Sequence, residues 1–417
     1  MRYAYRVVIA AATVWFALVG CSSDGNTGTS DVVDSDIVAT NPADTTDSVV
    51  ASELPSDKAD ARAQAATGEP NWPDDPCRLA GWYGDGECDT FCWEPDSDCM
   101  DPTDVTDTAD ADAVAIGPLL DSYFLSDDRH FPESVTWDAR RGAFFVGSLS
   151  RGDITRIRYD GTKTTFFAGT GEVDRLTLGL KVDLETHRLA VCTILNVTPP
   201  IGRIWIFDLE TRQRTHDIDL TTVLDEGACN DVVFDASGAL FVTDREHGVI
   251  YRVSQLDAPA GPTTTVWAQD ALLAPAVIGQ NGIALTADED ILLTTHFLPP
   301  ALFRTSVSDP TDVVQVELLS DFPADEVLGG ADGMIMHEGY LYVALGKSLL
   351  RLSSPDGTWR TIELDQHRLD VSISGVTVAE GQLYVLKSDV VQFVVGGVQP
   401  DIPFEIRRVD PAVFDAN

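Results

Sequence analysis

From residue 117 onward, short apolar runs are separated by short polar segments, and nowhere is there a long helical period. The runs are rich in Val, Ile, Leu, Phe and Tyr and are separated by turns with Gly, Asp or Glu, which is typical of β-strands. One unit of strand, turn and strand recurs in residues 134–148, 179–192, 231–244, 282–296, 333–345 and 375–387. A third β-rich run follows each copy, in residues 152–159, 202–209, 248–255, 300–307, 347–354 and 388–395. The pattern therefore predicts an all-β fold.

Repeats at a period of about 40 to 50 residues are typical of propellers or solenoids. Three visible strands and a more variable outer one make a four-stranded blade, and six blades around a channel protect nearly every sheet edge. An eight-stranded sandwich would not explain six aligned copies. We therefore expect a six-bladed β-propeller over residues 117–417.

The loop that enters the innermost strand of each blade opens at the propeller axis, so one residue per blade can converge there. In the six copies this residue is Glu133, Gly179, Asn230, Asn281, Asp332 and Ser374. Four of the six carry a carboxylate or amide oxygen. Asn-Gly and Asp-Gly are also ordinary turn pairs, so the prediction of a site depends on their coincidence at one repeat position.

The chain begins like a targeting segment, with Arg2 and Arg6 before an apolar run that ends in Leu18-Val19-Gly20-Cys21. This tetrapeptide resembles a bacterial lipobox, which implies a signal peptide over residues 1–20 and a lipidated Cys21. The alternative is an ordinary signal peptide with a chance cysteine. Because Ser22 and Ser23 directly follow Cys21 in place of the Asp that retains lipoproteins at the inner membrane, the resemblance implies a lipid anchor in the outer membrane, facing the periplasm or the cell surface. We expect membrane contact only through this anchor.

Charge divides the chain. Of the formal net charge of -39, much lies in residues 22–116, where Asp and Glu predominate and apolar residues are few. Such segments cannot bury enough surface to order, so we expect disordered acidic linkers over residues 22–75 and 101–116. The charge repels phosphate backbones, which excludes nucleic acid as a partner. We expect a monomer.

Export makes disulfides permissible for the remaining cysteines. Residues 76–100 form a small module with two expected bridges of open connectivity among Cys77, Cys88, Cys92 and Cys99. The module resembles a shortened Lin-12/Notch repeat, a family that binds calcium through Asp side chains; the alternative is a stapled spacer. Cys192 and Cys229 lie in adjacent repeats, where pairing and two buried free thiols are both open.

Residues 125–410 resemble the SMP-30/gluconolactonase/LRE-like family. The resemblance depends on the segments Glu133-Ser134-Val135-Thr136-Trp137, Asn230-Asp231, Asn281-Gly282 and Asp332-Gly333. That family binds a divalent metal through one Glu, one Asn and one Asp. The resemblance implies metal ligands at Glu133, Asn281 and Asp332, with Asn230 and Asp231 contacting substrate. Val232 and Ala228 stand where the family has Gly and often Arg, so the substrate is expected to differ.

The resemblance implies a metal-dependent hydrolase that opens a lactone or related ester of a sugar-derived small molecule, with Asp332 also acting as general base. The all-oxygen set favours calcium, with magnesium, manganese or zinc as alternatives. A non-catalytic propeller that binds a ligand or protein and is displayed on the anchored tether is the second hypothesis. A quinoprotein-like dehydrogenase is a third, although the axial loops show no basic cluster for its cofactor.

Overall fold

A computed structural model describes Ala61 and residues 116–126, 130–170, 175–274, 278–319, 328, 330–390 and 401–415. All of these except Ala61 belong to one compact unit. The signal peptide, Cys21, both acidic linkers and the cysteine module lie outside the described residues, Ala61 and Ile116 apart, and stay predictions. Within the described part, no helix has the length and apolar character needed to cross a membrane.

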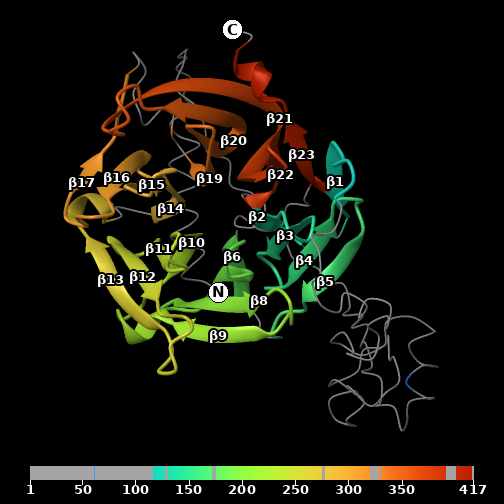
Figure 1. Cartoon of the computed structure of the whole chain (residues 1–417), viewed down its shortest axis with the longest axis horizontal. Helices are drawn as coiled ribbons and strands as arrows, with labels where there is room; N and C mark the ends of the chain where they lie inside the picture. The colour runs from blue at the N-terminus through green and yellow to red at the C-terminus, as the bar shows by residue number, and fades with distance from the viewer. Residues whose placement is uncertain are drawn as a thin grey trace, which may run out of the picture. The chain divides into compact units, whose positions relative to one another are not determined.

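The strands form six antiparallel blades arranged around an axis (Figure 1). Four blades are separate sheets of four strands, which confirms the predicted propeller. Blade 1 contains β2 (Pro132–Asp138), β3 (Ala143–Ser148), β4 (Ile154–Arg158) and β5 (Lys163–Phe167). Blade 2 contains β6 (Arg175–Asp183), β7 (Arg188–Leu195), β8 (Ile201–Asp208) and β9 (Arg214–Asp219). Blade 3 contains β10 (Cys229–Phe234), β11 (Leu240–Asp244), β12 (Val249–Ser254) and β13 (Thr263–Gln269), and blade 4 contains β14 (Ile278–Leu285), β15 (Ile291–Leu298), β16 (Ala301–Ser306) and β17 (Val313–Gln315).

Blades 5 and 6 share one sheet because two long strands each serve twice. The first half of β20 (Tyr340–Ser353) pairs with β19 (Ala331–His337), and its second half, after Gly346, pairs with the start of β21 (Thr361–Ala379). The end of β21 becomes the inner strand of blade 6. The short β18 (Glu317–Leu318) adds to β21 in parallel. Short 3-10 helices follow at Leu220–Thr222, Ala271–Leu273 and Pro411–Phe414.

The first described strand closes the ring. β1 (Ser122–Leu125) pairs with β23 (Phe404–Val409), which pairs with β22 (Gln382–Lys387), so the last blade takes its outer strand from the start of the propeller. The prediction that residues 388–395 form the third strand of this blade is wrong, because β21 and β23 occupy both edges of β22. The apolar run at 388–395 has a stronger strand pattern than the charged sequence of β23.

The core is divided among the six blade interfaces. Each of the six apolar clusters lies between two neighbouring blades. In β11, Leu240 and Val242 pack toward blade 2 while Phe241 packs toward blade 4, as the alternation of a strand requires. Strands buried on both faces therefore appear in the sequence as continuous apolar runs.

A disulfide joins blades 2 and 3. Cys192 of β7 and Cys229 of β10 are bonded, with 5.8 Å between their Cα atoms. The structure thus decides between the two alternatives that the sequence left open. The bond lies directly before Asn230, so it fixes the start of β10 where the predicted site begins.

Candidate active site

The inner strand of every blade carries a β-bulge or irregularity in its pairing at an equivalent place, which in blade 6 lies in the second part of β21 and holds Ser374 alone. A bulge bends the strand and re-aims the side chains within it. The first bulge residues are Glu133, Leu178, Asn230, Asn281, Asp332 and Ser374. The structure thus brings the predicted residues to equivalent positions, with one correction. In blade 2 the equivalent residue is Leu178, because Gly179 takes the second place in that bulge.

The glycines of these bulges allow neighbouring blades to touch. A Cβ atom on Gly179 would lie 2.2 Å from Asp231 Oδ1, and one on Gly282 would lie 2.2 Å from the carbonyl oxygen of Asp332. Neither glycine has a positive φ. The interpretation of Asn281-Gly282 and Asp332-Gly333 as ordinary turn pairs is therefore wrong, because both pairs lie inside strands. Their glycines allow the neighbouring blade to approach closely.

Amide hydrogen bonds connect blades 3, 4 and 5 at the axis. Asn230 donates through Nδ2 to Asn281 Oδ1. Asn281 donates through its own Nδ2 to the carbonyl oxygen of Ala331 at 3.0 Å and also bonds the Asp332 carboxylate. Thr243 Oγ1 donates to the Asn281 carbonyl oxygen at 2.8 Å. Asn281 is thus held from both neighbouring blades.

Three carboxylates complete the site. Glu133 is 8% exposed, and its buried Oε2 has no hydrogen-bond partner among the described residues. Asp231 accepts from the backbone N–H groups of Val232, at 2.8 Å, and Ile283, at 3.4 Å. Asp231 and Asp332 stay partly exposed. The site therefore contains a buried acid beside two acids that water can reach.

The acids act on one another. Burial, then the charges of Asp332 and Asp231, raise the pKa of Glu133 well above its ordinary value. Burial and the charge of Asp231 raise the pKa of Asp332 to about 8. Burial raises the pKa of Asp231 to about 6, although the Val232 N–H group and Lys181 lower it. Like charges in a low dielectric favour the protonated form, so the site is short of positive charge.

Two positively charged side chains lie near the acids and were not among the residues predicted from the sequence. Lys181 lies on the inner strand of blade 2 and lowers the pKa of Asp231. Arg245 directly follows β11 and lowers the pKa of Glu133. Lys181 gives a usable sequence signal, since it interrupts the apolar inner run of its repeat. Arg245 gives none, because only the folded chain brings it near the first blade.

The donor set fits a hard divalent cation. Among the described residues, no group of three or more His, Cys, Asp and Glu side chains is arranged to hold a metal ion. The predicted ligand set contains only two side chains of these types, Glu133 and Asp332, and its third member is the amide of Asn281. All its donors are oxygens, which calcium and magnesium prefer. The unpaired Glu133 Oε2 and the raised pKa values of the acids are what a cation would relieve.

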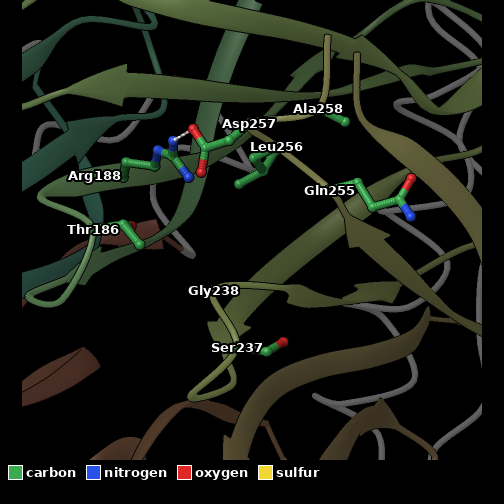
Figure 2. Close-up of a pocket in the computed structure, with 8 residues that line it drawn as sticks. All are labelled: Thr186, Arg188, Ser237, Gly238, Gln255, Leu256, Asp257 and Ala258. Carbon is green, nitrogen blue, oxygen red and sulfur yellow. Dashed lines mark hydrogen bonds and ion pairs between the residues drawn. The ribbon is translucent and has the colours of Figure 1, made fainter. Parts of the chain in front are cut away.

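A cleft of about 330 Å³ lies elsewhere, where turns of blades 2 and 3 meet (Figure 2). Arg188 pairs with Asp257 across it. The cleft is lined by Thr186, Arg188, Ser237, Gly238, Gln255, Leu256, Asp257 and Ala258. Ser237 and Gly238 follow the end of β10, whereas Asn230 is near its beginning. The cleft shares no residue with the axial acids and is not the candidate site.

A family model described as SMP-30/Gluconolactonase/LRE-like region matches residues 131–385 of the sequence, a span that includes all six bulges. The chain belongs to this family. No curated protein sequence matches the SMP-30/gluconolactonase-like chain.

Solved structures agree on the fold. The major allergen Mala s 1 of Malassezia sympodialis is 17% identical with a TM-score of 0.59, covering 72% of this chain and 98% of its own. A putative oxidoreductase (glucose dehydrogenase) of Thermus thermophilus is 16% identical with a TM-score of 0.52, covering 69% and 99%. A gluconolactonase of Xanthomonas campestris is 17% identical with a TM-score of 0.48, covering 70% and 91%. At these identities the likeness to the first two structures shows the fold alone.

Proposed function

We propose that this SMP-30/gluconolactonase-like propeller is a divalent-cation-dependent hydrolase that opens a lactone or related ester of a sugar-derived molecule. The family match supports a lactonase-type propeller. The observation that carries the proposal is the buried Oε2 of Glu133, which has no partner in the described part of the chain and lies near the charges of Asp231 and Asp332. A buried polar atom without a partner costs about 1–3 kcal/mol, so a ligand is expected to satisfy it.

Glu133, Asn281 and Asp332 would hold the cation, with calcium expected first and magnesium, manganese or zinc as alternatives. A divalent cation supplies Lewis acidity, polarising the lactone carbonyl and stabilising the negative charge that develops on its oxygen. To serve as a ligand, the Asn281 amide oxygen gives up its bond from Asn230. The Asn230 amide is then free to donate to the substrate.

Asp332 handles the proton. Its carboxylate is partly exposed and, when ionised, accepts a proton from the water that attacks the carbonyl carbon. A bond forms between the water oxygen and that carbon, the ring carbon–oxygen bond breaks, and Asp332 returns the proton to the leaving ring oxygen. The products are a hydroxyl and a carboxylic acid, which ionises. Asp231, fixed by two backbone N–H groups, contacts the substrate beside Asn230.

Hydrolysis of a panel of aldonolactones and simpler lactones by the full chain tests this proposal. Rates above the uncatalysed reaction are measured after chelation and after addition of each divalent cation. We expect turnover that chelation removes, that a cation restores, and that Asp332→Ala abolishes. Folded protein without turnover under any cation would instead support the non-catalytic binding propeller.

A matched control uses a carboxylate away from the axis. Asp288 lies in the turn between β14 and β15, where it accepts from Thr286 Oγ1 at 2.6 Å. Asp288→Ala removes the same group from the same half of the propeller without touching the site. Equal loss in both variants would contradict a specific role for Asp332.

A further inference from the structure

The axial site contains two cationic side chains that its acids do not bind directly. Within the described part of the chain, the Lys181 ammonium makes no hydrogen bond or ion pair, and Asp231 is the charge that acts on its pKa. The Arg245 guanidinium uses only Nε, which donates to Glu246 Oε1 at 3.1 Å. Its two terminal nitrogens have no partner among the described residues. Both groups thus have hydrogen-bond donors that no described residue accepts.

Strand geometry places Lys181 beside Asp231. Residues two apart on a strand share a face, so Lys181 points to the same side of β6 as Gly179. The space of the missing Gly179 Cβ is filled by Asp231, whose Oδ1 would lie 2.2 Å from it. Burial lowers the pKa of the Lys181 ammonium and Asp231 raises it. Lys181 is partly buried, and among the described residues its ammonium has no partner that a ligand would have to displace.

Backbone bonds place Arg245 at the start of the inner strands of blades 3 and 4. Its N–H donates to the carbonyl oxygen of Ala228 at 3.2 Å, and its carbonyl oxygen accepts from the N–H of Gly279 at 2.8 Å. Ala228 directly precedes β10, and Gly279 is the second residue of β14. Arg245 therefore lies at the end of these strands where the bulges lie.

A bound cation would leave the donors of Lys181 and Arg245 to an anion. Glu133, Asp231 and Asp332 bring three negative charges against the two positive charges of Lys181 and Arg245, and Glu246 pairs with Arg245 only at Nε. A divalent cation would offset most of the charge of the three acids, so the Lys181 ammonium and the terminal nitrogens of Arg245 could attract a ligand of the opposite sign. We propose that Lys181 and Arg245 bind a carboxylate of the substrate, so that the preferred substrates are lactones that carry an additional acid group. This inference rests on the proposed lactone hydrolysis.

The test compares glucarolactone, which carries a free carboxylate, with neutral gluconolactone in the full chain loaded with its cation. The wild-type protein should show the higher kcat/KM for glucarolactone. A hydrogen bond to a charged group is worth about 1.5–3 kcal/mol, so Lys181→Met should lower this preference about 10- to 100-fold, and Lys181→Arg should retain part of it. No preference in the wild-type protein, or an equal loss with both lactones in Lys181→Met, would overturn the inference.

Lys163→Met is the matched control. Lys163 begins β5, the outer strand of its blade, and donates through Nζ to the carbonyl oxygen of Phe124 at 2.8 Å. This variant loses one ammonium far from the axis and should keep the wild-type preference. Inhibition of the wild-type protein gives a second measurement that needs no variant. Glucarate should inhibit more strongly than the neutral polyol sorbitol, and equal inhibition would contradict the inference.

Binding separates failure of this inference from failure of the proposed function. Thermal shifts are recorded with glucarate or sorbitol while the cation is in excess over the sugar acid. If no lactone is hydrolysed but glucarate stabilises the wild-type protein more than Lys181→Met, the anion site stands and the hydrolase proposal fails. If gluconolactone is hydrolysed and glucarate has no effect, the hydrolase stands and the anion site is refuted.

Discussion

Asp332→Asn should have opposite effects on activity and on stability. In the unfolded chain this acid ionises near its ordinary pKa of 3.8, whereas burial and Asp231 raise its pKa to about 8 in the folded protein. Between these values the folded state keeps a proton that the unfolded state has lost. The free energy of unfolding therefore falls as pH rises, by up to about 1.4 kcal/mol per pH unit. Asparagine does not ionise, so the variant escapes this loss.

The assay is urea unfolding of chelator-treated protein from pH 5 to pH 9. At pH 8 the variant should be more stable than the wild-type protein by at least about 2 kcal/mol, while lactone turnover is abolished. Added cation should stabilise the wild-type protein most at high pH, because a bound cation takes the place of the proton. A gain in stability with a loss of activity is typical of a functional site.

Asp288→Asn is the control for this comparison. A hydrogen bond from Thr286 lowers the pKa of Asp288, so its carboxylate is ionised in both states above pH 5. This variant should keep the wild-type pH slope. Parallel stability profiles for the wild-type protein and Asp332→Asn, or a wild-type stability that rises from pH 5 to pH 8, would refute the electrostatic reasoning.

Three further predictions concern the frame of the site. Gly179→Ala should lower both stability and kcat/KM, since its Cβ would displace the Asp231 carboxylate; unchanged kinetics would show that this contact does not matter. Replacing Cys192 and Cys229 together by Ala should cost about 4 kcal/mol in urea unfolding, because the bond closes a loop of separation 37; a loss below about 1 kcal/mol would argue against the cross-link. A chain that begins at residue 127 lacks β1, so the edge of β23 is open and this chain should self-associate. A chain that begins at residue 116 keeps β1 and should stay monomeric. Size-exclusion chromatography that shows both chains as monomers would contradict this prediction.

The sequence predicted the fold where strands are buried on both faces. The runs that became β11 and β22 each contain consecutive buried apolar residues, and the repetition of such runs was enough to infer six blades. It failed where position depends on partners far along the chain. Nothing local indicates that β1 completes the last blade, or that charged β23 displaces the apolar run at 388–395.

The candidate site was predicted in part for the same reason. Periodicity alone aligned Glu133, Asn230, Asn281 and Asp332, and the bulges confirm their equivalent positions. It misplaced the equivalent residue of blade 2 by one position, because the sequence does not show at which residue a bulge begins. In this blade the bulge begins at Leu178 and ends at Gly179. The charge coupling among the acids arises only when different blades meet.

Convergence of the inner-strand bulges on one cation site can be tested by anomalous diffraction from crystals of the full chain soaked with manganese. We expect one strong peak in the propeller, surrounded by oxygens of Glu133, Asn281 and Asp332, that is absent from crystals of Asp332→Asn. No peak at the axis, or a peak that the variant retains, would contradict a cation site formed by these residues.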